Sequence, residues 1–382
     1  MQYTFTTEQR EFRAVLRRFF GQTSPPSVVR RLMETEAGWD TALWRDLNTQ
    51  LGVSGVHVPE AYGGMGFGFV ELGIVLEEMG RALVCAPYFS SVVLATSAIL
   101  NGADEAQKQA LLPGLAAGDI VAALAFTEPN GQWDQDGIET TAHPAAGRYR
   151  LSGVKSFVID GHTADLLIVP ARRPGSTGQS GLSLFTVRGD AAGLTRTSLQ
   201  TLDPTRKLAR VEFADVEAEL LGAPEQAAGP LAKTLAQAAA MLANEMVGGA
   251  ERLRESALEY ANLRVQFGRP VSSFQAMKHK QADMLVDVEL ARSAAYQAAQ
   301  AAADGRADLS VLASLAKACA SEAYLQTAIH TIQIHGGIGF TWENDTHLWF
   351  KRAKSSEVLL GDPTWHREQM MRAWANNGSE VQ

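Results

Sequence analysis

The spacing of hydrophobic and polar positions divides the chain into three stretches. Up to about residue 120, apolar side chains recur every three or four positions, which predicts helices. The first helix is expected to be capped by Thr7, and its apolar face carries Phe12, Val15, Leu16, Phe19 and Phe20. Further helices are expected over residues 69–78, 90–100 and 105–117, after a turn-rich segment at 59–66.

The middle stretch, residues 121 to 222, has a shorter period. Its apolar runs are brief, rich in strand-forming residues and separated by Gly, Pro or Asp, which predicts strands. The expected strands cover residues 121–126, 148–151, 156–159, 166–169, 182–187 and 210–213. Short strands at this even spacing indicate an all-β barrel or sandwich.

The last stretch, from about residue 225, returns to helical spacing and is rich in alanine. Segments with few helix breakers predict long helices over residues 230–261, 273–303 and 310–335, with another near 364–375. Long antiparallel helices of this kind pack as a bundle. The predicted order along the chain is therefore helices, strands, helices.

Composition narrows the class of protein. The chain has 382 residues, 46% of them hydrophobic, and a net charge of −8 without any run of Lys and Arg. This argues against nucleic acid or an anionic membrane as the main partner. No stretch is apolar enough for a membrane span, and the N-terminus lacks the pattern of a signal peptide. Cys85 and Cys319 fit neither a metal site nor a disulfide framework, so we expect a soluble cytoplasmic protein without a metal.

Five motifs, in this order along the chain, resemble those of the acyl-CoA dehydrogenase family. They are Val-Pro-Glu-Ala-Tyr-Gly-Gly (58–64), Ala-Phe-Thr-Glu-Pro (125–129), Arg-Val-Gln-Phe-Gly-Arg-Pro (264–270), Ser-Phe-Gln-Ala-Met-Lys-His (273–279) and Gln-Ile-His-Gly-Gly-Ile-Gly-Phe (333–340). The resemblance implies an α+β fold with an N-terminal helical domain (1–120), a middle β-barrel (121–224) and a C-terminal four-helix bundle (225–382). It also implies a homotetramer, assembled as a dimer of dimers.

The resemblance further implies FAD, held between the middle domain and the bundle with part of each site from a neighbouring subunit. The residues carried over to the flavin ring are Leu124, Phe126, Thr127, Phe157, Val158 and Ile159. Those carried over to the rest of the cofactor are Arg264, Phe267, Gln275, Gln333, Gly336, Gly337 and Asp362. The planar, two-pronged guanidinium of Arg264 suits pyrophosphate oxygens, and glycines allow a backbone to approach a ligand closely.

Two departures from the family pattern concern the ring. Phe157 stands where members commonly have tryptophan, and Ile159 stands where many have a threonine that bonds to flavin N5. We therefore expect backbone contacts at Ile159. Two local alternatives stay open: Gly336 with Gly337 as the cap of the preceding helix, and Arg264 as a solvated ion pair with Glu259.

Dehydrogenation of a thioester needs a carboxylate that removes the α proton, donors for the thioester oxygen and an acceptor for hydride. Many family members place the base where this chain has Leu360. A second subgroup places it in the first bundle helix, at the positions matching Ala238 and Ala239. Both family positions therefore lack a carboxylate in this chain.

Glu245 is the candidate base that remains. It follows Ala238 by seven residues, about two helical turns, so both lie on nearly the same face of the helix. Its neighbours are almost uncharged, and a lone carboxylate there is costly unless it has a function or a tertiary partner. The alternative is therefore an ion pair with an arginine. Asp362, expected to bond a backbone N–H in its turn, and Asp134 are further candidate acids.

Two more residues are candidates for the substrate side. The backbone N–H of Leu360 still offers a donor to the thioester oxygen, because that contact needs no particular side chain. Trp133 stands where the family commonly has a small hydroxyl residue near the thioester, so it is a candidate substrate contact. The alternative for Trp133 is a surface anchor of the β domain.

The leading hypothesis is FAD-dependent α,β-dehydrogenation of an acyl-CoA thioester. Glu245 takes the proton, hydride passes to flavin N5, and an electron-transfer flavoprotein receives the electrons. A second hypothesis is a non-catalytic partner subunit, which supplies half of each FAD site in a mixed α2β2 assembly with a paralogue. A third is an oxidase on the same fold. The acyl group stays open, from branched, aromatic and dicarboxylic chains to steroid side chains.

Overall fold

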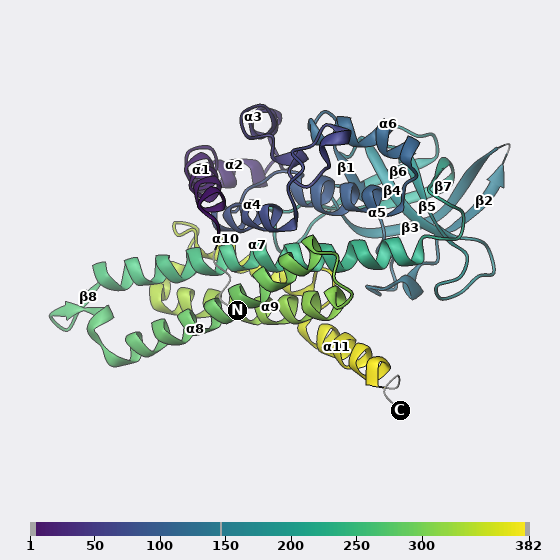
Figure 1. Ribbon diagram of the computed structural model, residues 1–382. Helices are drawn as coiled ribbons and strands as arrows, with labels where there is room; N and C mark the ends of the chain where they lie inside the picture. The colour runs from purple at the N-terminus through teal and green to yellow at the C-terminus, as the bar shows by residue number, and fades with distance from the viewer. Residues whose placement is uncertain (1–4, 146, 379–382) are drawn as a thin grey trace. The chain divides into compact units, whose positions relative to one another are not determined.

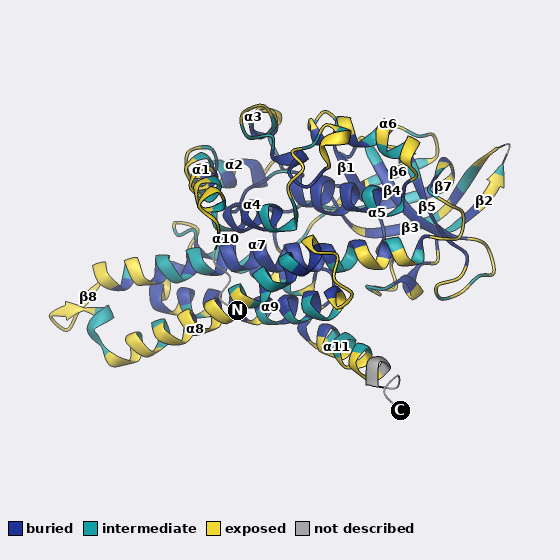
Figure 2. Ribbon diagram, in the orientation of Figure 1, coloured by how far each residue is buried: buried dark blue, intermediate teal, exposed yellow. Residues whose placement is uncertain are grey.

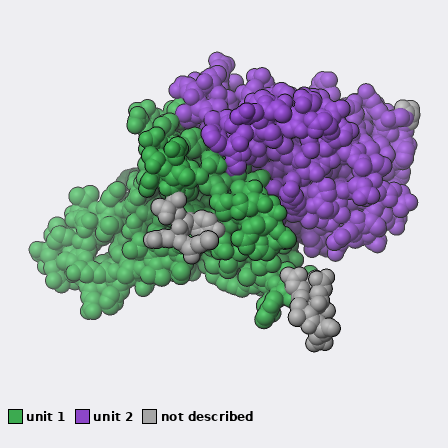
Figure 3. Space-filling model, viewed as in Figure 1, with its two compact units in different colours: residues 1–30, 69–84, 239–382 green, residues 31–68, 85–238 purple. Residues whose placement is uncertain are grey.

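The computed structural model describes residues 5–145 and 147–378, and the chain divides into two compact units (Figure 1, Figure 3). The sheet unit comprises residues 31–68 and 85–238. The helical unit comprises the residues up to 30, residues 69–84 and the residues from 239 onward. Each unit therefore gathers segments that are distant in the sequence.

The sheet unit is built on a closed barrel. Its strands are β1 (Ala122–Leu124), β2 (Thr141–Ala145), β3 (Arg148–Ile159), β4 (Leu166–Arg172), β5 (Leu182–Arg188), β6 (Leu194–Leu199) and β7 (Leu208–Leu221). Strands β4, β2, β3, β7 and β5 pair in that order, and β5 pairs again with β4, so the ring closes. Strand β1 adds to β4 in parallel, and β6 adds to β7 in antiparallel orientation.

Alternating side chains fill the barrel. Along β7, every second residue from Ala209 to Phe213 is buried, as expected for a strand with one face on a core. These residues join a single apolar cluster with Leu151, Val169 and Phe185. The predicted middle β-barrel is confirmed.

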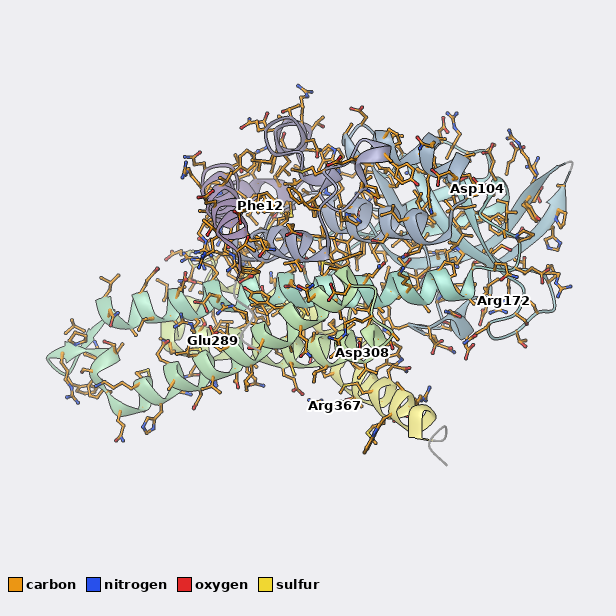
Figure 4. All side chains as sticks on the ribbon, viewed as in Figure 1. Phe12, Asp104, Arg172, Glu289, Asp308 and Arg367 are labelled. Carbon is orange, nitrogen blue, oxygen red and sulfur yellow. The ribbon has the colours of Figure 1, made fainter. Side chains whose placement is uncertain are left out.

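Short helices accompany the barrel in the sheet unit. They are α3 (Thr41–Leu51), the turns η1 (Val53–Gly55) and η2 (Glu60–Tyr62), the π-helical η3 (Phe89–Thr96), α5 (Ser97–Gly102), α6 (Glu105–Ala116) and the turn η4 (Gln135–Gly137). A capping box of Asp104 and Gln107 fixes the start of α6; Asp104 is labelled in Figure 4. Helix α2 (Pro26–Met33) belongs to the helical unit up to Arg30.

The helical unit contains the long helices. They are α1 (Thr7–Thr23), α4 (Phe69–Ala82), α7 (Ala228–Leu263, of which the part from 239 belongs here), α8 (Gln275–Ala303), α9 (Leu309–His335), α10 (Thr346–Val358) and α11 (Pro363–Gly378). The hairpin β8 (Val265–Gln266) and β9 (Arg269–Pro270), with η5 (Val271–Ser273), connects α7 to α8, and η6 (Gly336–Phe340) follows α9. Figure 2 shows this hairpin as exposed. Alanines make up most of the buried face of α8 and recur on that of α9. The predicted helical C-terminal region is confirmed.

Two glycines bring α4 and α7 into close contact. A Cβ atom on Gly80 would lie 2.0 Å from the carbonyl oxygen of Glu245, and one on Gly248 would lie 1.8 Å from that of Glu77. Both distances are far below any real contact, so only glycine fits at either position. The backbone around Glu245 is therefore fixed against α4.

Several predicted elements differ from the structure. The N-cap of α1 is Thr6, whose side chain accepts the N–H of Gln9, and not Thr7. The strands predicted over 148–151 and 156–159 are two parts of β3. Strands β2 and β6 were not predicted because Ala142 is their only buried residue and neither strand has an apolar alternation. Helices α2, α3 and α10 were not predicted either.

The structure also bears on membranes and metals. Within residues 5–145 and 147–378, no helix is long and apolar enough to cross a membrane. In the same ranges, no three His, Cys, Asp or Glu side chains lie close enough together to hold a metal ion. Among the described residues, neither Cys85 nor Cys319 forms a disulfide.

Candidate functional site

The first segment predicted at the flavin ring lies between β3 and β4 in the sheet unit. Leu124 ends β1, and the chain continues alongside β4, where Ala125 donates its N–H to Ile168 at 2.9 Å. The carbonyl oxygen of Thr127 then accepts the N–H of Ser156 at 2.8 Å. The structure therefore brings the segment of Phe126 and Thr127 next to the second predicted ring segment.

The second segment contains a β-bulge. The pairing of β3 with β7 shifts register between Lys155 and Val158, and Phe157 has a φ of 56°. Phe157 is 45% exposed, whereas Val158 and Ile159 are buried. A bulge redirects a side chain out of the alternation of its strand. The Phe157 ring is therefore the side chain that this segment presents outward, which suits a ring contact.

The loop after the first segment carries Trp133. Its ring lies 6.0 Å from that of Phe126, centroid to centroid, so the candidate substrate contact packs beside a predicted flavin residue. Asp134 accepts the N–H of Asp136 at 3.1 Å and caps the short turn η4. This local bond accounts for Asp134 without a catalytic role.

The helical unit contains a hollow of about 550 Å³. Five residues that the resemblance assigns to the cofactor line it, namely Arg264, Phe267, Gln333, Gly336 and Gly337. Gln275 begins α8 next to this wall but does not line it. The sequence prediction therefore names residues that the fold collects in one place, although they come from two segments about 70 residues apart.

The lining suits a nucleotide diphosphate. Arg264 makes no ion pair among the described residues, and Glu259, its predicted alternative partner, lies 3.7 Å from Arg252 instead. Gly336 has a φ of 66° and caps α9, which confirms the cap alternative. Cβ atoms on Gly336 and Gly337 would meet only open space. An unpaired guanidinium, an amide and accessible backbone form a donor set that fits phosphate and ribose oxygens.

Sequence analysis missed one wall of this hollow. The rings of Tyr260 and His335 stack at 4.4 Å with an angle of 23° between their planes. His335 donates from Nδ1 to the carbonyl oxygen of Thr331 at 2.8 Å, and burial lowers the pKa of its imidazole. The two stacked rings therefore form a flat, uncharged surface on this wall of the hollow. The two residues lie on different helices, α7 and α9, so no local motif points to the stack.

Glu245, the candidate base, lies on α7 in the helical unit and is 5% exposed. Its Oε1 accepts a hydrogen bond from Nη1 of Arg352 at 2.8 Å. The side chains of the pair are 6% and 4% exposed, so the pair is shielded from water. The structure therefore places Glu245 in the ion pair that the sequence left open as the alternative.

The surroundings of this pair are tightly packed. A Cβ atom on Gly80 would lie 3.0 Å from Cγ of Glu245, and Trp349, one turn before Arg352 on α10, donates its Nε1–H to the carbonyl oxygen of Gly80 at 3.3 Å. Helices α4, α7 and α10 thus meet at Glu245. A proton taken up by this carboxylate would leave the buried guanidinium of Arg352 without its counter-charge, which is costly.

The positions that the resemblance matches to the family's base, namely Leu360 and the pair Ala238 and Ala239, are apolar and buried in this chain. Leu360 has a φ of 61°, a left-handed conformation that costs a non-glycine residue roughly 1–2 kcal/mol. Lys317 holds this turn: its Nζ donates to the carbonyl oxygens of Glu357 at 3.0 Å and Gly361 at 2.9 Å. Burial lowers the pKa of Lys317 to about 7.

Asp362 begins the next helix. Its Oδ1 accepts the N–H of Trp365 at 2.8 Å, which is the backbone contact expected for it. Like Asp134, it is therefore used as a cap. Among the three acids that the sequence offered as bases, Glu245 has a side-chain cation as its partner, and the two aspartates have backbone N–H groups.

Models of known protein families match almost the whole chain. The acyl-CoA dehydrogenase N-terminal domain matches residues 6–119, the middle domain residues 123–216 and the C-terminal domain residues 230–375. The acyl-CoA dehydrogenase IpdE2 of Mycobacterium tuberculosis is 33% identical over 93% of this chain and 94% of its own length. This chain belongs to the acyl-CoA dehydrogenase family. Members of the family are FAD flavoproteins and oxidoreductases of acyl-CoA, and those properties extend to this protein.

Solved structures agree with the family assignment. A variant of the steroid ACAD Tcur3481-Tcur3483 is similar with a TM-score of 0.88 and 31% identity, over 97% of this chain and 99% of that chain. The ChsE4-ChsE5 complex of Mycobacterium tuberculosis is similar with a TM-score of 0.88 and 28% identity, over 98% and 99%. The acyl-CoA dehydrogenase fold, with helical terminal regions around a sheet-rich middle domain, is confirmed.

Proposed function

We propose that this chain is one of two related chains in a cytoplasmic acyl-CoA dehydrogenase that passes its electrons to an electron-transfer flavoprotein. The chain supplies FAD-binding surfaces, and its partner supplies the carboxylate that removes the α proton. The observation that carries the proposal is the buried ion pair of Glu245 and Arg352, in a chain with Ala238 and Leu360 at the family's base positions.

A base for this reaction must be able to change its protonation state during turnover. Arginine stays charged at any working pH. Protonation of Glu245 would therefore oppose the burial of Arg352 in every cycle. A structural role for the pair, joining α7 to α10, requires no such change and agrees with the dense packing around Gly80.

The similar structures support a mixed assembly. The ChsE4-ChsE5 complex and the Tcur3481-Tcur3483 steroid ACAD are each named for two chains, and this chain matches one chain of each over at least 97% of its own length. The proposal extends this arrangement to the present chain. It also makes thioesters of steroid side chains or other bulky acyl groups the first substrates to test.

FAD, when bound, supplies the two-electron acceptor of the reaction. On the side of this chain, Arg264, Gln333 and the glycines after α9 would hold its diphosphate and adenosine part. In the sheet unit, Thr127 and Phe157 would meet the ring of a bound FAD. The backbone N–H of Leu360 keeps its proposed role as a donor to the thioester oxygen, and Lys317 fixes the turn that presents it.

The original base hypothesis makes a different prediction, and one double variant separates the two. Replacing Glu245 and Arg352 together by methionine removes both charges at similar volume, an exchange that is often neutral or stabilising for a buried pair. We expect the double variant, assembled with its partner chain, to fold, bind FAD and bleach the oxidised flavin with acyl-CoA at a rate close to the wild type. Stopped-flow absorbance over a panel of thioesters measures the rate.

The opposite outcome is equally clear. If Glu245 is the base, the double variant keeps its yellow colour but bleaches at least about 100-fold more slowly, the low end for a positioned base. The assembly itself is tested by purification. The chain produced alone should show no bleaching, and coexpression with a related chain that carries a glutamate at either family position should restore it. Full activity of a homo-oligomer would overturn the proposal.

A further inference from the structure

The sheet unit contains an ion pair that the function described above does not use. Nζ of Lys155 lies 2.7 Å from Oε1 of Glu128, and the two side chains are 0% and 2% exposed. Glu128 directly follows Thr127, and Lys155 directly precedes Ser156 and Phe157. The pair therefore lies at the point where the two predicted ring segments meet.

Each member of the pair also holds backbone. The carboxylate of Glu128 accepts the N–H of Glu139 at 2.9 Å and that of Thr140 at 3.0 Å. The ammonium of Lys155 donates to the carbonyl oxygen of Phe126 at 3.4 Å, as well as to Glu128 at 2.7 Å. Together the two side chains tie three stretches of backbone to one another.

The stretches held in this way carry unusual geometry. Next to Lys155, the bulge at Phe157 adopts a left-handed φ of 56°, which is unfavourable for a bulky residue. The bond from Ser156 N–H to the carbonyl oxygen of Thr127 links the bulge to the other ring segment. A conformation of this kind persists only where the surrounding structure determines it, and such positions cluster at ligand sites.

Burial of this pair is by itself weak evidence that it stabilises the fold. Burying two charges costs several kcal/mol per ion, and well-packed apolar residues of similar volume are often at least as stable. Burial lowers the pKa of Lys155 to about 8, even though Glu128 favours its charge. The two charged side chains therefore lose their hydration but hold the backbone segments around them in place.

We propose that Lys155 and Glu128 are positioning residues for the cofactor, which hold the backbone of Thr127 and Phe157 ready for the flavin ring before FAD binds. This inference rests on the FAD binding of the family and on the assignment of these two segments to the ring. It does not depend on which chain supplies the catalytic base. It concerns how tightly and in what environment the ring is held.

The test uses three variants of the full chain. Glu128→Gln keeps the shape of the side chain but replaces an oxygen acceptor by a donor, and Lys155→Met removes the ammonium. The matched control is Glu217→Gln, which breaks the exposed pair between Glu217 on β7 and Arg148, a residue of β3 like Lys155. FAD affinity is measured by titrating the apoprotein and following flavin fluorescence, and the visible spectrum of the bound flavin reports the ring environment.

We expect Glu128→Gln and Lys155→Met each to raise the Kd for FAD at least 10-fold and to shift the visible bands of the bound flavin. The Kd of the double variant for FAD should not exceed that of the single variant that binds FAD more weakly, because the pair acts as a unit. Glu217→Gln should bind FAD like the wild type. Wild-type affinity and an unchanged spectrum in Glu128→Gln would overturn the proposal, whatever happens to its melting temperature.

A pH series adds a readout that a purely structural role would not move. Glu128 and Arg172 are the charged groups that act on Lys155; Arg172, labelled in Figure 4, ends β4. The wild-type Kd for FAD should rise between pH 7 and pH 9 as Lys155 loses its proton, and this rise should be absent in Lys155→Met. An equal pH dependence of the Kd for FAD in the wild type and in Lys155→Met would contradict the proposal.

The wild type is titrated alone and together with its partner chain. A wild type that takes up FAD in neither form also contradicts this proposal. A wild type that binds FAD and turns over without a second chain refutes the mixed assembly but leaves the positioning role of the pair intact, so the two failures are distinguishable.

Discussion

Each unit of the chain buries an ion pair between a glutamate and a cation, and the two pairs differ in what they connect. Glu245 and Arg352 join the helices α7 and α10 in the helical unit. Glu128 and Lys155 hold backbone segments in the sheet unit through hydrogen bonds to N–H and carbonyl groups. The first pair therefore fixes helices against one another, and the second fixes the local course of the chain beside the expected flavin.

The cation decides whether such a pair can respond to pH. Arginine keeps its charge at any working pH, so Arg352 stays a cation beside Glu245. The pKa of Lys155 is lowered by burial to about 8, so the second pair loses its charge within a range that a protein survives. A buried glutamate at a candidate site therefore has to be judged by its partner. A carboxylate held by arginine is poorly suited to exchange protons.

The largest effect is expected from breaking the arginine pair. Arg352→Met leaves the charge of Glu245 buried without its cation, so the free energy of unfolding should fall by about 3–5 kcal/mol. Adding Glu245→Met should recover most of this loss. Urea unfolding of the purified proteins measures both. Lys354→Met on the exposed side of α10 is the matched control, and it should stay within about 1 kcal/mol of the wild type. A loss below about 1 kcal/mol for Arg352→Met would show that the pair is not a structural link.

A smaller effect is expected in the pH dependence of stability. The usual pKa of a lysine is 10.5, and that of Lys155 in the folded chain is about 8. Between these values the unfolded chain binds more protons than the folded chain, so the titration of Lys155 makes stability rise with pH, by about 3 kcal/mol across the window. Lys155→Met should remove this rise, whereas Arg352→Met should keep it. Unfolding curves from pH 7 to pH 10.5 measure the difference in stability between the wild type and Lys155→Met. Other titrating groups, such as Lys317, contribute equally to both proteins and therefore cancel. Parallel curves for the wild type and Lys155→Met would contradict the assignment.

The sequence predicted those features that depend on short motifs or on a regular spacing of apolar residues. The loop that begins at Arg264 and the segment of Gln333, Gly336 and Gly337 each read as a short motif, and the fold brings both to one hollow. The barrel and the long helices follow from the spacing of apolar residues, because each buries one regular face. The stacked rings of Tyr260 and His335 have no such signal.

What the sequence could not give depends on contacts between distant elements. Arg352 lies 107 residues after Glu245, on a helix that was not predicted. The buried face of α10 mixes Leu348 and Trp349 with Arg352 and Ser356, so its polar members conceal the helical period. The bulge at Phe157 was hidden for a related reason, since the pattern of a strand does not reveal an inserted residue.

The smallest effect is expected at an exposed pair, and it tests whether burial is what gives the other two their importance. Arg148 on β3 and Glu217 on β7 are 53% and 46% exposed. Water and salt screen such a pair, so Glu217→Gln should change the free energy of unfolding by less than about 1 kcal/mol, and added salt should reduce even that difference. Urea unfolding at low and high salt measures it. If Glu217→Gln lowered the free energy of unfolding as much as Arg352→Met, independently of salt, exposed and buried pairs would not differ in their contribution to stability. Burial would then not distinguish the contact of Glu245 with Arg352 from an exposed pair such as that of Glu217 with Arg148.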